Sequence, residues 1–565
     1  MKKFLNSTII LGTVILLGSG CKKFLDINTN PNSPTDATPE LVLPQAIVTS
    51  AASTVSYDNF GAWTGGYKAN AGGYGGWGTV WTYNFTSSDY TALWTSAFDG
   101  INQLNVVLSK TDSDGPYKYH NAMARIMKAY LYTRLIDQYG DVPYSEADKG
   151  LNNLSPKYDN YADVYKALYA DLDDAIAVLN TASVTNVTKA VTAGQDPFGG
   201  GSAAAGLTKW KQFANTIKLK MLIRAQKVSD LASWVTASKA TLPTAATGYI
   251  VTDAIVQPGY SATTASQVNP KWAAYTWNTS GAAIGAGLSQ LPTPWILSFY
   301  DGKKLDDVDR GEAIYSSFGT SVSQTISGVS ITFQGPANNQ LGYDIEPVKR
   351  SKNGSYWYSG TSTGTTANAA TNVWGVLKGG TMGTVLMTLS EAKFLLAEAS
   401  LASVNLLPAL SGSTKTLFED GITASFQYLY SYANGTYGLA NPYTAIRLKD
   451  DYKTANVGNP NERLVNFDLA TTDEQKLEAI ITQKYIAVNF INSEEGFNEY
   501  RRTGYPKQVN GSVTATETFA SIKSGAPAAD KLPTRVLYPA VEFQVNAANV
   551  PKGISSYTTK IFYAK

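Results

Sequence analysis

Cysteine and histidine are almost absent from this 565-residue chain, which has only Cys21 and His120. One cysteine excludes any disulfide within the chain, so stability must come from a packed core, which a chain of this length can build. Metal clusters built from histidine and cysteine are excluded as well. A hydrolase with a histidine base would have to use His120, but its place at the beginning of a predicted helix favours a solvated helix-end residue.

Charged residues are also few. They make up 16% of the chain, and the 46 Lys and Arg nearly balance the 44 Asp and Glu. Proteins that bind nucleic acid carry clustered basic residues that neutralise phosphates. The basic doublets here, such as Lys22-Lys23 and Arg501-Arg502, are isolated and fit ordinary solvated side chains. The sequence therefore predicts no nucleic-acid partner.

Long hydrophobic runs are missing too. The apolar run at residues 8–17 is about ten residues long, whereas a membrane-spanning helix needs about 20. Lys2 and Lys3 precede this run, and the small residues 18–20 lead to Cys21. The pattern is typical of an export signal, and its end resembles a bacterial lipoprotein signal. We predict a signal peptide over residues 1–20 and lipid attachment at Cys21; the alternative is a chance thiol beside an ordinary secretory cleavage site.

Acylation of Cys21 with more than one chain, palmitate among them, would hold the protein stably on a membrane surface, because one acyl chain gives only marginal binding. Residues 28–39 (NTNPNSPTDATP) contain turn formers and no apolar periodicity. This predicts an extended leader over residues 21–40. Residues 41–565 are predicted to form a single helical domain with loop insertions.

Aromatic residues are plentiful, with 35 Tyr and 11 Trp beside 48 Gly. Rings with few rotatable bonds favour contact surfaces that stack on a sugar face or another apolar face. The segment 60–94 predicts either a loop built for contact or a loop folded on itself. It contains seven rings, at Trp63, Tyr67, Tyr74, Trp77, Trp81, Tyr83 and Trp94.

Apolar residues recur at helical spacing in several segments. The predicted helices cover residues 119–139, 161–179, 208–227, 386–402, 418–430 and 473–489, and helical patterning also begins at residues 41–55. The polar stretches 192–206 and 317–383 are too rich in glycine for long helices, and Ile326, Ile331 and Phe333 around Gly328 predict at most a small hairpin. The fold class is therefore mainly α, with stacked tetratricopeptide-like hairpins and no strict 34-residue repeat.

No acidic cluster in the sequence marks a catalytic or metal site. Asp112, Asp114 and Gly115 match only part of a calcium loop, whose later ligands and closing Glu are missing, so we predict a turn there. The acidic run at residues 171–174 (DLDD) is interpreted as the solvated face of its helix. A carboxylate pair acting on glycosides has no signature either. We predict no catalytic residue and no cofactor, and structural Ca²⁺ stays open.

The motif YGDVPY at residues 139–144 resembles the turn typical of SusD/RagB-family lipoproteins. Gly140, Asp141 and Pro143 in it are expected to be structural, since they turn the chain at a helix end. Other matching stretches follow in order and span nearly the whole chain. They are residues 21–31, 210–224, 390–399, 421–426, 483–485, 500–506 and 532–549.

The resemblance, to the SusD-like second subfamily, implies a cell-surface outer-membrane lipoprotein with an all-α body. It implies capture of a nutrient, an oligosaccharide in the best-known relatives and a peptide in some, and delivery to a TonB-dependent SusC-like transporter. The expected role is binding rather than catalysis. The alternatives are a peptide-binding relative with the same partner and a surface glycoside hydrolase.

The resemblance also implies that the ligand platform comes from aromatic rings on loops. Rings in polar, glycine-containing stretches, such as residues 356–358 and Tyr275, are less natural as core residues. The predicted stacking residues are Trp77, Trp81, Trp277 and Trp357, and the predicted hydrogen-bonding partners are Asn84, Asp89 and Asn278. Arg501 and Arg502, next to Glu499, are expected to clamp helix ends through charge-assisted hydrogen bonds.

Overall fold

The computed structural model describes most of the chain after residue 36. The described residues are 37–71, 78–147, 149–181, 187–276, 284, 287, 289–315, 321–326, 329–334 and 373–565, with only the backbone described at 321–334. Every structural statement below concerns these residues.

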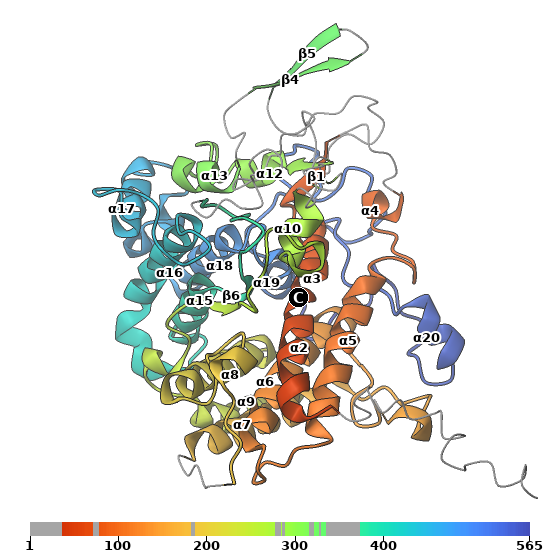
Figure 1. Ribbon diagram of the computed structural model, residues 1–565. Coiled ribbons are helices and arrows are strands. Elements are labelled where there is room, and N and C mark those ends of the chain that lie inside the picture. Colours follow the sequence, from red (N-terminus) through yellow and green to blue (C-terminus); the bar gives the residue numbers. More distant parts are fainter. Residues whose placement is uncertain are drawn as a thin grey trace, which may run out of the picture.

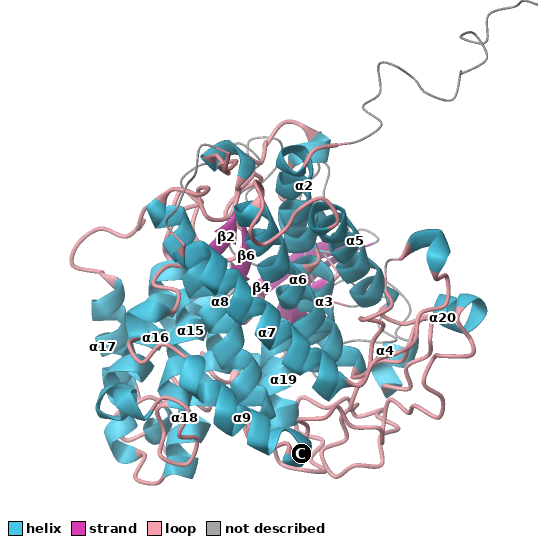
Figure 2. Ribbon diagram, turned by 90° about the horizontal axis from the view of Figure 1, so that it is seen from below, coloured by secondary structure: helices cyan, strands magenta, loops and turns pink. Residues whose placement is uncertain are grey.

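The first half of the molecule is a stack of helices, which occupies the lower part of Figure 1 and is seen from below in Figure 2. Neighbours in the stack are antiparallel hairpin partners, with α5 on α6, α6 on α7 and α7 on α8. The helices are α2 (Pro39–Ala52), α3 (Thr54–Thr64), α5 (Thr91–Leu108), α6 (Lys118–Tyr139), α7 (Tyr161–Asn180), α8 (Ala204–Ala225) and α9 (Ala232–Ser238).

The second half adds another group of helices, on the left of Figure 1 in green to blue, with α20 set apart on the right. The group packs as α15 on α16, α16 on α17 and α15 on α18, and α19 packs on α3 of the first half. Its helices are α15 (Leu389–Ala399), α16 (Thr414–Leu429), α17 (Ala445–Ala455), α18 (Asp473–Ala487), α19 (Ser493–Thr503) and α20 (Ala540–Val545).

Strands are short and form two-stranded antiparallel sheets in the described part of the chain. The pairs are β1 (Lys68–Asn70) with β3 (Gln290–Pro292), β2 (Ala254–Val256) with β6 (Thr384–Met387), and β4 (Ser321–Ile326) with β5 (Val329–Gln334). Four small helices lie in the upper part of Figure 1, namely α4 (Gly78–Thr82), α10 (Pro270–Tyr275), α12 (Pro294–Leu297) and α13 (Val308–Ile314). Short 3₁₀ helices connect the larger elements at Gly150–Asn152, Ala193–Gln195, Ser229–Leu231, Lys239–Thr241, Ala246–Gly248, Ala265–Gln267, Pro408–Ser413, Glu462–Leu464 and Phe467–Leu469.

The predicted mainly α fold of stacked helix pairs is confirmed. Helices occur at all six predicted positions, and the small hairpin expected around Gly328 is β4–β5. The segment 386–402 yields a shorter helix than expected, because residues 384–387 pair with β2 as strand β6 before α15 begins. The α6 helix is buried on nearly all sides rather than along one face, since α2, α5, α7 and α8 all pack against it.

The turn after α6 confirms the structural role expected for the YGDVPY motif. Gly140 has φ +73°, a conformation that a residue without Cβ adopts easily. The Asp141 carboxylate accepts a hydrogen bond of 2.8 Å from the backbone N–H of Tyr161, the first residue of α7. The hydroxyl of Tyr538 donates to the carbonyl oxygens of Tyr139 and Asp141, at 2.8 Å each, so two of the matching motifs meet in space.

The interior of the fold contains a network of buried ion pairs that joins α6, α8, α15, α18 and α19. On α8, Lys220 pairs with Glu391 (2.9 Å) and Glu495 (2.6 Å), and Arg224 pairs with Glu495 (2.7 Å) and with Asp137. Lys484 pairs with Glu499 (2.7 Å). Arg502 pairs with Glu398 (2.7 Å) and Glu499 (2.5 Å). The expected clamp by Arg502 is confirmed. The interpretation of Arg501-Arg502 as solvated side chains is wrong, because each is only 7% exposed.

The expectation of a solvated His120 is also wrong. His120 lies in the first turn of α6, as predicted, but its side chain is fully buried and packs edge-on against Tyr117 at 5.3 Å between ring centroids. Neither ring nitrogen has a hydrogen-bond partner. Burial lowers the pKa of His120, and the charge of Glu40 opposes this effect. The fold therefore favours the neutral form of the imidazole.

Other polar predictions hold in part. Residues 112–115 form an exposed bend, as expected for a turn. In α7, Asp174 is exposed, whereas Asp171 accepts a hydrogen bond of 3.1 Å from Tyr144 and Asp173 forms an ion pair with Lys218. Within the described ranges, no helix combines the length and apolar character that crossing a bilayer requires.

Candidate functional site

Four of the seven predicted ligand-binding residues, namely Trp77, Trp277, Asn278 and Trp357, lie outside the described residues, as does Cys21. The other three are Trp81, Asn84 and Asp89, which lie on α4 and in the turn before α5. They remain predictions, and the structure supplies their surroundings.

Trp81 is 7% exposed and packs within the hydrophobic core. Asn84 is exposed, and its backbone N–H donates to the hydroxyl of Thr82 at 3.3 Å. Both oxygens of the Asp89 carboxylate already accept hydrogen bonds, one from the Thr79 hydroxyl (2.7 Å) and one from the N–H and hydroxyl of Thr86 (2.6 and 2.8 Å). Asp89 therefore ties α4 to the following turn in this structure.

Three other described rings of segment 60–94 are core residues, whereas Trp63 is partly buried. Tyr67 stacks on Tyr485 with 4.4 Å between centroids and donates its hydroxyl to the Tyr485 carbonyl. Tyr83 accepts a hydrogen bond from Ser521, and Trp94 packs edge-on against Tyr139. For these rings, the alternative of a segment folded into the protein is the correct one, because helices from later in the chain cover them.

The β1–β3 pair joins two distant parts of the chain. Asn70 pairs with Gln290, and the N–H of Ala71 donates to the carbonyl of Ser289 at 2.8 Å. In Figure 1, β1, α4 and α10 all lie in the upper part of the molecule.

A buried lysine lies beneath the junction. The Lys68 amine donates to the side-chain oxygens of Asn59 (2.5 Å) and Gln290 (3.0 Å), and lies 5.1 Å from the Trp63 ring centroid and 5.3 Å from that of Tyr275. Burial lowers the pKa of Lys68 to about 7, with Lys271 adding to this effect and Asp58 opposing it. Among the described residues, no carboxylate lies within 4 Å of this amine, whereas Asp58 pairs with Lys271 at 2.9 Å.

The junction thus gathers amide groups, two aromatic rings and an amine in one place, and they bond mainly to one another, because Lys68, Tyr275 and Gln290 are buried. The expectation that Tyr275 is not a core residue is wrong. Sequence reasoning did not find Lys68, Asn59 or Gln290. A lone lysine in an aromatic segment carries no signal of burial, and the pairing of β1 with β3 joins residues 222 positions apart.

A second place with suitable chemistry is a cavity of about 680 Å³ between the β2–β6 pair and the end of α16. Its lining includes the rings of Phe198, Tyr428 and Tyr432 together with Asp253 and Lys378. The Lys378 amine donates to the Tyr428 carbonyl, and burial lowers the pKa of Lys378 to about 7. Burial raises the pKa of Asp253, whose carboxylate accepts a hydrogen bond of 2.7 Å from the backbone of Leu389. Rings, amides, one carboxylate and two lysines, Lys378 and Lys209, could hold a sugar here as well.

The part of the chain that the structure describes contains no group of three or more His, Cys, Asp or Glu residues placed to hold a metal ion. Its central buried carboxylates, such as Glu398, Glu495 and Glu499, are paired with cations instead.

Comparisons with known proteins agree with the observed fold. The model of the SusD-like family, described as "Starch-binding associating with outer membrane", matches residues 31–539. No curated protein matches the chain. Among solved structures, a SusD homologue from Bacteroides uniformis is 21% identical with a TM-score of 0.58, over 93% of this chain and 99% of that one.

Two further solved structures have similar folds. A chitin-binding protein is 23% identical with a TM-score of 0.59, over 93% of this chain and 99% of that one. A chitin-binding SusD homologue from Flavobacterium johnsoniae is 20% identical with a TM-score of 0.56, over 92% and 98%. At these identities, the likeness establishes a shared fold.

Proposed function

The chain belongs to the SusD-like family, and from this premise we propose that it is a lipid-anchored cell-surface protein that captures an oligosaccharide and delivers it to a TonB-dependent SusC-like transporter. The family description and the chitin-binding function of two proteins with the same fold support a carbohydrate ligand. The lipid anchor at Cys21 and the transporter are parts of the proposal that rest on the sequence and the family.

The observation that carries the proposal is the match of the SusD-like family model over residues 31–539. Trp77, Trp277 and Asn278 are proposed as ring and amide contacts for a sugar. A good ring contact adds about 1 kcal/mol beyond the buried area. Two or three such contacts would give micromolar to millimolar affinity, which suits a protein that must release its ligand to a transporter.

Calorimetry on the protein without residues 1–21 tests the ligand class. We expect neutral oligosaccharides of the starch or chitin type to bind, short peptides not to bind, and chromatography to detect no shorter sugars after incubation. Peptide binding would identify the protein as a peptide-capturing member of the family, and released sugars would identify it as a hydrolase. We also propose that capture needs no metal, so that EDTA leaves the Kd unchanged.

A variant series then locates the site. We expect Trp77→Ala combined with Trp357→Ala to weaken glycan binding at least tenfold through the loss of stacking. Trp234→Ala is the matched control, because this ring lies on α9, in the stack of helices in the lower part of Figure 1, and packs against Tyr169. Tyr432→Ala tests the cavity beside α16. If this variant loses binding while the double variant keeps it, the ligand site is that cavity and the predicted platform is wrong.

The anchor and the transporter need separate measurements. A Cys21→Ala variant should leave the membrane fraction and lose the acyl mass from its first residue after processing. Affinity purification of the wild-type protein from outer membranes should recover a TonB-dependent transporter. Recovery of the Cys21→Ala protein in the membrane fraction, in the same amount as the wild type, would contradict lipid anchoring.

A further inference from the structure

A cavity of about 470 Å³ lies at the end of α19, where the motif YRRTGYP (residues 500–506) leaves the helix. We call it the α19 cavity. It is bounded by α19, by residues 504–510, by the loop 528–534 and by the segment 560–565. Its size is within the range of about 300–1,000 Å³ that is usual for small-molecule sites. It is separate from the β1–β3 junction and from the cavity beside α16, with which it shares no lining residue.

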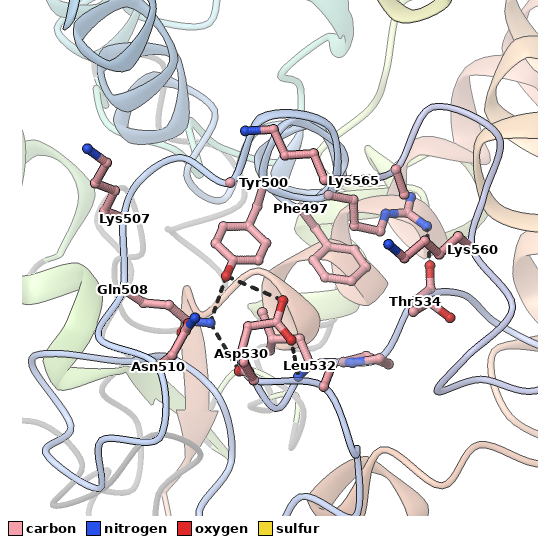
Figure 3. A pocket seen from close by; sticks show the side chains of 16 residues that line it. Phe497, Tyr500, Lys507, Gln508, Asn510, Asp530, Leu532, Thr534, Lys560 and Lys565 are labelled. Carbon is pink, nitrogen blue, oxygen red and sulfur yellow. Dashed lines mark hydrogen bonds between the residues drawn. The ribbon is translucent and has the colours of Figure 1, made fainter. Parts of the chain in front are cut away.

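The lining of the α19 cavity is cationic in a chain whose charges otherwise balance. Arg501, Lys507, Lys560 and Lys565 contribute positive side chains, and Asp530 is the one acidic side chain among the lining residues. Lys565 is the last residue of the sequence and also has a terminal carboxylate. Figure 3 shows Lys507 and Lys560 on opposite sides of the cavity, with the Tyr500 ring between them.

Asp530 is already engaged. Its carboxylate accepts hydrogen bonds from the Tyr500 hydroxyl (3.5 Å) and the Leu532 N–H (3.3 Å). The Gln508 amide braces the same corner by donating to the Tyr500 hydroxyl (2.8 Å) and to the Asp530 carbonyl (3.1 Å), as the dashed lines in Figure 3 show. Within the described residues, Asp530 forms no ion pair, and of the cavity's cations Lys507 has a carboxylate nearby, that of Glu478 outside the lining.

Arg501 is the strongest indication of a missing anion. It is only 7% exposed, yet each acceptor of its guanidinium group is neutral. These acceptors are the carbonyls of Thr534 (3.0 Å) and Asp137 (2.9 Å), the side-chain oxygens of Gln138 (3.0 Å) and Asn498 (2.5 Å), and the Tyr563 hydroxyl (3.2 Å). The Arg501 Nε has no hydrogen-bond partner in the structure. A buried cation without a carboxylate is costly, and a bound anion would offset that cost.

The remaining lining residues fit a ring-shaped ligand. Phe497, Leu532 and Pro533 offer apolar surface beside Tyr500, which suits the carbon face of a sugar. Lys560 has no ion pair or hydrogen bond of its own among the described residues, whereas Lys507 lies 3.5 Å from Glu478 and Lys565 donates to the Thr503 carbonyl. The free amine of Lys560 and the cationic surroundings are positioned to meet a carboxylate attached to such a ring.

We propose that the α19 cavity binds a carboxylated sugar residue of the uronic acid type. The saccharide part of this assignment rests on the proposed function, and the charge rests on the cavity. Charge-assisted hydrogen bonds from lysine to the carboxylate, together with the positive charge of Arg501 behind the cavity wall, would give the site its selectivity over neutral sugars. A ligand of this size is expected to bind with a millimolar Kd.

NMR titration of the full chain without residues 1–21 tests the proposal with glucuronate, glucose and acetate as probes. We expect glucuronate to bind in the millimolar range and more weakly at higher salt, because screening weakens exposed charge pairs. Glucose and acetate should bind at least tenfold more weakly. A Lys560→Gln plus Lys565→Gln variant should lose at least fivefold in glucuronate affinity. The matched control is Lys523→Gln plus Lys552→Gln, two exposed lysines outside the cavity, which should bind as the wild type does.

Several results would overturn the proposal. They are the absence of glucuronate binding, equal binding of glucose or acetate, and an unchanged affinity in the Lys560 and Lys565 variant. The binding of neutral oligosaccharides is measured separately and involves other residues. Its failure would remove the proposed function while a positive glucuronate result would still establish the anion site.

Discussion

Arg501 and Arg502 are adjacent residues of α19 and are equally buried, yet their surroundings differ in charge. Arg502 binds Glu398 and Glu499, and although burial lowers its pKa, these two carboxylates raise that pKa overall. Arg501 binds neutral acceptors, and burial lowers its pKa; Tyr563 and Asp137 oppose this effect, whereas Arg224 and Arg535 add to it. One arginine completes the ion network of the interior, and the other brings unpaired charge to the α19 cavity.

The difference separates two uses of buried charge. In the network, cations and carboxylates from five helices pair, which offsets much of their desolvation free energy and fixes how those helices pack. Arg501 and Lys68 are hydrogen-bonded to neutral groups, which offset less of the desolvation free energy. Paired charge indicates architecture, and buried unpaired charge indicates a place where a ligand or a proton can act.

The largest effect is expected at Glu495, which contacts both Lys220 and Arg224. Glu495→Gln leaves two buried cations short of a carboxylate, and it should lower the free energy of unfolding by about 3–5 kcal/mol. Urea titration followed by circular dichroism measures this loss. The control is Asp163→Asn, whose exposed pair with Lys166 should contribute less than about 0.5 kcal/mol. A loss at Glu495 as small as the control's would contradict the importance of the network.

The two arginines themselves test the comparison directly. Arg502→Gln strands the carboxylates of Glu398 and Glu499, so we expect a loss of about 3 kcal/mol. Arg501→Gln removes a charge whose acceptors are neutral, and we expect a loss of about 1–2 kcal/mol. The two variants are compared in the same urea titration. Equal losses would show that the presence or absence of a carboxylate partner does not change what these arginines contribute to the free energy of unfolding.

The unpaired amine of Lys68 should make stability depend on pH on the alkaline side. Its pKa in the folded protein is about 7, below the usual value of 10.5, so the unfolded chain binds more protons between these values. The free energy of unfolding should therefore rise with pH, by about 2 kcal/mol between pH 7.5 and 9. Lys378, whose pKa is also about 7, titrates in the same range, so a Lys68→Met variant should show a rise about 2 kcal/mol smaller than that of the wild type when both proteins are unfolded across the pH range. An equal rise in the two proteins would mean that Lys68 is not one of the titrating groups.

The smallest effect is expected at His120, a third buried basic side chain without a carboxylate bonded to it. Because burial lowers its folded pKa, the unfolded state binds the extra proton first as the solution is acidified. Stability should fall as the pH drops below about 6.5, the ordinary histidine value. The His120→Phe variant keeps the ring and should reduce this dependence. An identical slope in both proteins would mean that His120 is not the titrating group.

The helical part of the fold could be predicted from the sequence because the signal was local. Helices such as α7, α16 and α18 repeat apolar residues at a spacing that any chain of this kind must bury. Helix α19 (SEEGFNEYRRT) was missed for the opposite reason. Its Glu and Arg residues resemble a solvated segment, and only partners from α6, α8, α15 and α18 make their burial possible.

The site was less predictable than the fold. Rings in a glycine-rich segment can pack inward or outward, and the sequence does not distinguish Trp81, which is in the core, from an exposed ring. The Lys68 cluster depends on a strand pair that joins distant parts of the chain. Arg501 and Arg502 are neighbours in the sequence, and only their tertiary contacts decide which of them pairs with carboxylates.

The turn after α6 has a consequence for the order of assembly. Its carbonyl groups are bound by Arg535 and Tyr538, which lie 396–399 positions later in the chain. The first helical hairpin can therefore form early, but its closing contacts wait until almost the whole polypeptide has emerged. Contacts of such long sequence separation slow folding. Loss of the segment after residue 534 would accordingly remove hydrogen bonds from the turn near residue 140, in a part of the chain synthesised hundreds of residues earlier.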